Sequence, residues 1–114
     1  MTGARQIFVM KKLVKNYRHV GRVAARYVAA GYSVTVNPPL KGVDFTATKH
    51  GIRFAGIILA EKKTYGVEEI EKAKEIAEKY KVKPIIILYG AGPRLAAEAL
   101  EKAKEYGIIV RRIR

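Results

Sequence analysis

Apolar positions along the chain follow two different periods, which predicts helices alternating with strands. Over residues 11–30, apolar side chains recur at spacings of three and four, the period of one helical face. They are Leu13, Tyr17, Val20, Ala24 and Tyr27. Gly31 then supplies a helix stop. Two further amphipathic helices are predicted, one over Val67–Tyr80 and one from Pro93 through Tyr106, which Gly107 ends.

The segments between these helices read as strands. Alternation predicts a short strand over residues 32–36, followed by a break at the two prolines. Residues 43–48 and 52–63 are predicted to form a hairpin that turns at Lys49, His50 and Gly51. The apolar run "PIIILYG" predicts a strand buried on both faces, and "GAGPR" after it reads as a turn. A last strand is expected over residues 108–110, before a basic tail.

The predicted element order is α-β-β-β-α-β-α-β, within the α/β class. An antiparallel meander followed by β-α-β crossovers gives a mixed β-sheet flanked by helices. A length of 114 residues suits one domain with a real core. No apolar run is long enough for a membrane span or a signal peptide, so we expect a soluble, cytoplasmic protein. The chain has no Cys, and its few amides with abundant Lys and Glu are typical of hyperthermophile proteins.

Positive charge is the strongest global signal. The net charge is +13, and residues 1–60 contain ten Lys or Arg against a single acid. Cations on the first helix form a stripe opposite its apolar face, which predicts binding to nucleic acid. The alternatives are a high isoelectric point that is unrelated to any partner, or binding to anionic lipid. The candidate contacts are Lys11, Lys15, Arg18, Arg22 and Arg26 on the stripe, with Lys41, Lys49 and Arg53 beyond it.

Candidate chemistry lies where the long predicted strand ends in charge. Asp44, the one aspartate of the chain, begins the hairpin, and Glu61 and Lys63 share a strand face at its far end. Two carboxylates with water and phosphate oxygens suit Mg²⁺ or Mn²⁺, which can activate water for attack on phosphorus. A neighbouring ammonium can orient that water and stabilise the transition state. The alternative is a turn aspartate plus an exposed Glu–Lys pair.

Strand register decides between these alternatives. A tight turn at His50 and Gly51 pairs Asp44 with about Ile57, four residues short of Glu61. At about 3.3 Å per residue that gap is too wide for one ion. A longer loop, a bulge or strong coiling is needed to close it.

Three segments together resemble the PD-(D/E)xK, or restriction-endonuclease-like, nuclease superfamily. "KGVDFTATKHG" and "IILAEKK" resemble the metal-binding segments of Mrr-type nucleases and archaeal Holliday-junction resolvases, and "PIIILYGAGPRLAAEALEKAKEYGIIV" resembles their closing strand, helix and strand. The resemblance implies one nuclease-like domain over residues 1–114, which cleaves phosphodiesters with Mg²⁺ or Mn²⁺. Asp44 and Glu61 would be metal-binding acids, Lys63 the catalytic lysine, and the backbone carbonyl of Lys62 a further ligand. It also implies a DNA substrate and a homodimer. Because the sequence shows no separate recognition domain and no aromatic ladder for stacking bases, we expect phosphate contacts and shape to lead binding, with a branched or structured substrate favoured.

The chain departs from this pattern in two places. Val43 stands where the motif has proline, and the first helix has no acid where many relatives carry Glu, since Val20 or Gly21 falls there. A non-catalytic nucleic-acid-binding or scaffold protein on the same fold is therefore the rival hypothesis. "GYSVTVNPPLKGVDF" has a weaker resemblance to archaeal tRNA-splicing endonucleases, but their catalytic Tyr position is Thr48 here. That kinship would imply a structural subunit. His50 reads as a turn residue and His19 as a polar-face neighbour.

Overall fold

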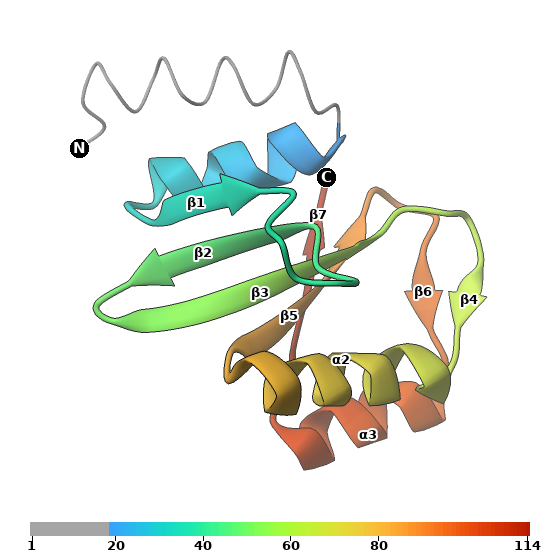
Figure 1. Cartoon of the computed structure of the whole chain (residues 1–114). Coiled ribbons are helices and arrows are strands. Elements are labelled where there is room, and N and C mark those ends of the chain that lie inside the picture. Colours follow the sequence, from blue (N-terminus) through green and yellow to red (C-terminus); the bar gives the residue numbers. More distant parts are fainter. Residues whose placement is uncertain (1–18) are drawn as a thin grey trace.

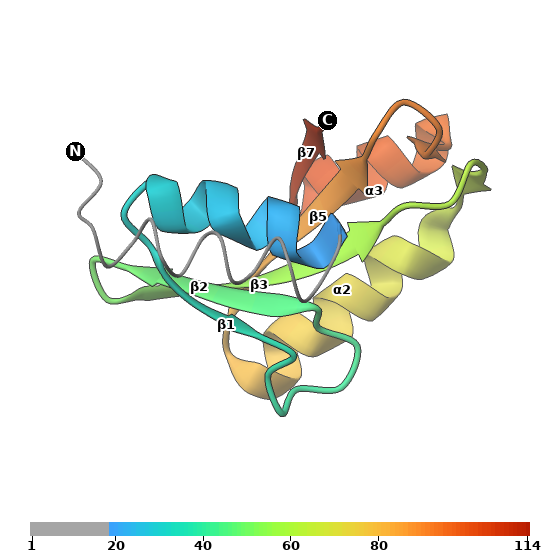
Figure 2. The same ribbon diagram turned by 90° about the horizontal axis from the view of Figure 1, so that it is seen from above.

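A five-stranded mixed sheet lies between one helix on one face and two helices on the other (Figures 1 and 2). The computed structural model describes residues 19–114. The described part of the N-terminal helix spans residues 19–29. The remaining elements are β1 (Ser33–Val36), β2 (Phe45–Lys49), β3 (Ile52–Leu59), β4 (Thr64–Tyr65), α2 (Val67–Tyr80), β5 (Lys83–Tyr89), β6 (Arg94–Leu95), α3 (Ala97–Tyr106) and β7 (Ile109–Ile113).

The sheet has the order β1-β2-β3-β5-β7. β1, β2 and β3 pair antiparallel, whereas β3, β5 and β7 pair parallel. The predicted mixed sheet flanked by helices is confirmed, together with the succession of its main elements. β4 and β6 were not predicted, because two-residue strands leave no periodicity in the sequence. They pair parallel with each other in a small second sheet.

Each face of the sheet has its own apolar core. On one face, Val23 and Tyr27 of the N-terminal helix pack on a cluster that includes Phe45 and Ile87. On the other, Ile70 of α2 and small side chains of α3 pack on β3 and β5. β5 is buried along most of its length, as its unbroken apolar run predicts for a strand covered on both faces.

The β2–β3 hairpin turns in two residues. Lys49 pairs with Ile52, and His50 and Gly51 both adopt positive φ, as the tight turn of a twisted hairpin requires. The hairpin loop is therefore the tight two-residue form, and not the longer loop that could have brought Asp44 closer to Glu61. At the other end, Phe45 is the register partner of Gly56, while the Asp44 N–H also donates to the Gly56 carbonyl at 2.9 Å. Asp44 and Phe45 thus both face Gly56, which is the arrangement of a β-bulge.

Several predicted boundaries were wrong. β2 spans Phe45–Lys49 rather than residues 43–48, so Asp44 precedes the strand and Lys49 belongs to it. β3 ends at Leu59 rather than residue 63, because its last partner in β5 is Leu88 and the chain bends over residues 61–63. The third helix begins at Ala97, since the residues after Pro93 form β6. The last strand extends to Ile113, so its arginines belong to the sheet and not to a tail.

Close packing over Gly56 gives a test of this core. A Cβ at Gly56 would overlap the ring of Phe45, which is fully buried. We predict that Gly56→Ala lowers the free energy of unfolding by roughly 1–3 kcal/mol, because the ring must shift in a filled core. Urea denaturation measures this loss. In a Phe45→Leu background the same substitution should cost less, and an equal cost in both backgrounds would contradict the mechanism.

Candidate active site

Asp44 lies beside the end of β3, where its carboxylate takes the place of a backbone hydrogen-bond acceptor from a neighbouring strand. Its Oδ2 accepts a hydrogen bond from the Ile58 N–H at 2.7 Å, and its own backbone carbonyl accepts one from Asn37. The side chain is half-buried. Burial raises the pKa of Asp44, and the Ile58 N–H and the charge of His19 oppose that rise. The carboxylate is therefore held in place by a backbone donor, with its other oxygen accepting no hydrogen bond from residues 19–114.

Glu61 and Lys63 lie in the bend that follows β3. Lys63 Nζ is 3.4 Å from Glu61 Oε2, and both side chains are more than half exposed. The same ammonium lies 4.8 Å from the ring centroid of Tyr65. The buried Tyr65 also uses its hydroxyl, which accepts a hydrogen bond from the Glu61 N–H at 3.2 Å. Tyr65 is thus the residue that shapes this bend, and its position in a two-residue strand explains why no sequence pattern indicated it.

The small β4–β6 sheet anchors the bend to the loop after β5. The Arg94 N–H donates to the Lys63 carbonyl at 3.0 Å, and the Ala96 N–H donates to the Tyr65 carbonyl at 2.9 Å. A Cβ at Gly92 would lie 3.0 Å from the Lys62 Cβ, so this glycine allows close approach to the bend. Within "GAGPR", residues 90–92 form a bend, as the predicted turn requires, whereas Arg94 begins β6.

The structure brings two of the three predicted catalytic residues into direct contact. Glu61 and Lys63 form an ion pair, whereas the contacts of Asp44 within residues 19–114 are with Ile58 and nearby backbone. The Asp44 backbone lies opposite Gly56, and its carboxylate reaches the Ile58 N–H, three residues before Glu61. That spacing corresponds to about 10 Å of extended backbone before the bend. The reach of the side chain, and not the bulge, therefore narrows the gap expected from sequence.

His19 lies near Asp44, although the sequence indicated only that it would be a neighbour on the polar face of the helix. It lies near enough to Asp44 for its charge to lower the pKa of that carboxyl, and its ring centroid is 5.6 Å from that of Tyr89. Its position on the helix indicated only a polar neighbour. Proximity to Asp44 arises from the packing of the helix across β2, β3 and β5, which no local pattern reveals.

The oxygen donors at this edge are of the kind that Mg²⁺ and Mn²⁺ prefer. They are the Asp44 and Glu61 carboxylates and the Lys62 carbonyl. Within residues 19–114 there is no cluster of three or more His, Cys, Asp or Glu side chains that could hold a metal. The donors are thus of the chemical type that suits a divalent cation, but residues 19–114 do not form a preassembled site for one.

The predicted nucleic-acid contacts lie on several elements. Lys11, Lys15 and Arg18 fall outside the described residues. Arg22 and Arg26 are exposed on the N-terminal helix, and Lys41 and Arg53 are exposed on the β1–β2 loop and β3. Lys49 donates to the Ala30 carbonyl at 2.8 Å, so its ammonium also ties the hairpin to the helix. No helix in the described part of the chain is long and apolar enough to cross a membrane.

Solved structures that resemble this chain identify its fold. No family model and no curated protein matches the sequence. A protein of unknown function, AF1548, superposes with a TM-score of 0.66 at 19% identity, covering 79% of this chain and 54% of that one. A repair endonuclease from Pyrococcus abyssi superposes with a TM-score of 0.59 at 14% identity, covering 94% and 46%.

Two further structures carry information about ligands. EndoMS in complex with double-stranded DNA superposes with a TM-score of 0.50 at 16% identity, covering 94% of this chain and 44% of that one. SfsA of Pyrococcus furiosus in complex with Ca²⁺ gives 0.52 at 13% identity, covering 95% and 53%. The chain thus spans about half the length of these proteins. It has the restriction-endonuclease-like fold of PD-(D/E)xK nucleases, as the sequence resemblance predicted.

The raised pKa of Asp44 predicts how its charge affects stability. An acid with a raised folded-state pKa is held better in its protonated form, so stability falls as pH rises through the interval from 3.8 to the folded-state value. Asp44→Asn should therefore leave stability at pH 7 unchanged or raise it, because the amide oxygen can still accept the Ile58 N–H. Urea denaturation at pH 3 and pH 7 measures this. Loss of stability at pH 7 in the variant, with none in Glu61→Gln, would contradict the prediction.

Proposed function

We propose that the protein is a metal-dependent endonuclease that hydrolyses phosphodiesters in DNA, with structured or branched DNA as the favoured substrate. The observation that carries the proposal is the half-buried, hydrogen-bonded carboxylate of Asp44 beside a strand end that continues into the Glu61–Lys63 ion pair. The fold is that of DNA repair endonucleases. Fold alone does not supply chemistry, so the proposal depends on these three side chains.

In this proposal the roles follow from chemistry and position. Asp44 and Glu61, with the Lys62 carbonyl, would hold Mg²⁺ or Mn²⁺ once phosphate oxygens complete its coordination. The metal, when bound, supplies charge stabilisation at phosphorus and a more acidic water. Lys63 donates hydrogen bonds to the attacking water or to a non-bridging oxygen, where negative charge grows. The attacking water adds to phosphorus and loses a proton to solvent, the P–O bond to the leaving strand breaks, and the leaving oxygen takes up a proton from solvent.

Affinity in this proposal comes from phosphate contacts. Cations of the N-terminal helix lie on an exposed face, and Arg22 and Arg26 are the described members. The described residues offer no aromatic ladder for stacking unpaired bases, so recognition is led by backbone and shape. We further propose assembly as a homodimer, as the sequence resemblance implies.

The second candidate is a DNA-binding protein without nuclease activity on the same fold. Two observations favour it. Residues 19–29 of the N-terminal helix contain no acid, and the described residues hold no cluster of three metal-binding side chains. In this alternative, Asp44 serves to satisfy the Ile58 N–H, and Glu61 and Lys63 form an ordinary surface pair.

Cleavage separates the two candidates. We predict that the wild type cuts at least one of four-way junctions, flaps, duplex or single-stranded DNA with Mg²⁺ or Mn²⁺. Lys63→Ala and Asp44→Asn should each reduce the rate by about 100-fold or more, because both groups act in the transition state. Lys104→Ala, which removes an exposed cation from α3, is the control and should cut normally.

Binding is measured on the same substrates with Ca²⁺ in place of the active metal. Lys63→Ala should lose about the affinity of one phosphate contact, and Asp44→Asn should bind equally well or better. Tight binding by a wild type that cuts none of the substrates would establish the non-catalytic candidate. Normal cutting by Lys63→Ala would remove this site assignment.

The basic face has its own test. The double variant Arg18→Ala, Arg22→Ala should weaken binding to all DNA sequences alike. The slope of log K against log salt should flatten by about two units, one for each lost phosphate contact. Fluorescence anisotropy across a salt series gives both values. Affinity and slope equal to those of the wild type would move the binding face to another part of the surface.

A further inference from the structure

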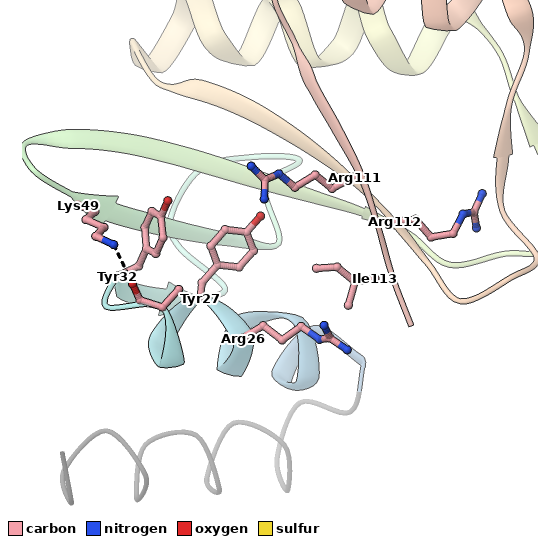
Figure 3. Close-up of a pocket in the computed structure, with 8 residues that line it drawn as sticks. Arg26, Tyr27, Tyr32, Lys49, Arg111, Arg112 and Ile113 are labelled. Atoms are coloured by element: carbon pink, nitrogen blue, oxygen red, sulfur yellow. Dashed lines mark hydrogen bonds between the residues drawn. The ribbon is translucent and has the colours of Figure 1, made fainter. Parts of the chain in front are cut away.

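An open pocket of about 600 Å³ lies against the C-terminal half of the N-terminal helix. Its walls come from that helix, from the end of β2 and from β7 (Figure 3). Lys49, which lines it, stands at the opposite end of β2 from Asp44. Five residue steps along the chain separate Asp44 from Lys49, about 17 Å at the rise of an extended chain. The pocket is therefore separate from the candidate active site.

The charged groups that line the pocket are all cations. Arg26, Lys49 and Arg111 contribute three of them, and no acid lines the pocket. Lys49 is committed to the Ala30 carbonyl, and Arg26 donates to the Arg114 carbonyl at 2.8 Å. The Arg111 guanidinium makes no hydrogen bond or ion pair with residues 19–114. Its fork of donors matches the oxygens of a phosphate group.

A second observation points to the same ligand chemistry. The hydroxyl of Tyr27 is buried without a hydrogen-bond partner, and the residue is only 8% exposed. Burial raises the pKa of Tyr27, while the nearby charge of Arg111 opposes the rise. In Figure 3 this hydroxyl points toward the Arg111 side of the pocket. A neutral phenol with a vacant donor beside a guanidinium favours a ligand oxygen that only accepts hydrogen bonds.

The size of the pocket extends this argument beyond phosphate alone. Sites for small organic ligands measure roughly 300–1,000 Å³, and the pocket falls within that range. Tyr32 adds an aromatic wall, with its ring 5.2 Å from that of Tyr27 and 5.1 Å from Lys49 Nζ. We propose that this pocket binds the phosphate monoester of a nucleotide, with phosphate at Arg111 and Tyr27 and the nucleoside toward Tyr32. The nucleotide is either free or the phosphorylated end of a nucleic-acid strand.

Calorimetric titration in EDTA tests the pocket without metal, so the outcome is independent of cleavage at Asp44. AMP is titrated beside adenosine and inorganic phosphate. We expect AMP to bind at one site, and we expect adenosine and inorganic phosphate each to bind at least about tenfold more weakly than AMP. Arg111→Ala should weaken AMP by about tenfold or more, because it removes charge-assisted hydrogen bonds. Tyr27→Phe, which keeps the ring, should weaken it by a few-fold, and Lys104→Ala should have no effect.

Strand ends distinguish the two sources. A short oligonucleotide with a 5′-phosphate is compared with the same strand ending in a 5′-hydroxyl. A preference for the phosphate that disappears in Arg111→Ala assigns the pocket to strand ends, and AMP binding without such a preference assigns it to free nucleotide. The proposal is overturned if AMP binds no better than its fragments and the 5′-phosphorylated strand binds no better than the 5′-hydroxyl strand. Inorganic phosphate binding as tightly as AMP, or an equal loss in Lys104→Ala, also overturns it.

Discussion

Hydrogen bonding along the two edges of β3 holds the protein together. One edge pairs antiparallel with β2 and the other pairs parallel with β5, so β3 joins the hairpin half of the sheet to the crossover half. The last β3 residue that pairs with β2 is Gly56, two residues before Ile58, which leaves the Ile58 N–H without a backbone partner on that edge. The Asp44 carboxylate accepts that bond. A buried N–H without an acceptor would be costly, so this position needs an acceptor whether or not it has catalytic work.

That double role explains why one aspartate supports two accounts of the protein. As an acceptor for Ile58, Asp44 would be retained by a non-catalytic scaffold. As a half-buried carboxylate with an open oxygen at the end of a central strand, it is also suited to a hard cation. Glu61 and Lys63 are the residues on which the accounts differ, because their exposed ion pair is catalytic in one account and an ordinary surface pair in the other.

Much of the fold could be predicted from sequence because its signals are local. Helical spacing over Val67–Tyr80 and the apolar run of β5 each reflect one element and the faces it buries. The point where β3 ends could not be predicted, because it depends on the length of β5 beside it. β4, β6 and the role of Tyr65 depend on pairing between distant loops. In the site, Glu61 and Lys63 were predicted to share a strand face, whereas they form their ion pair in the bend after β3. The nearness of His19 to Asp44 arises only when the helix packs on the sheet.

The pairing of β4 with β6 has a consequence for the energetics of ligand binding. A loop that becomes ordered only when a ligand arrives loses conformational entropy worth about 1–2 kcal/mol for each residue fixed. Here the carbonyls of Lys63 and Tyr65 are already bonded to the loop after β5. The conformational entropy of these residues is therefore lost during folding and not during binding. A ligand at this edge would encounter a backbone that is already organised. The same two bonds connect the segment before α2 with the segment before α3, so the two crossovers share this anchor.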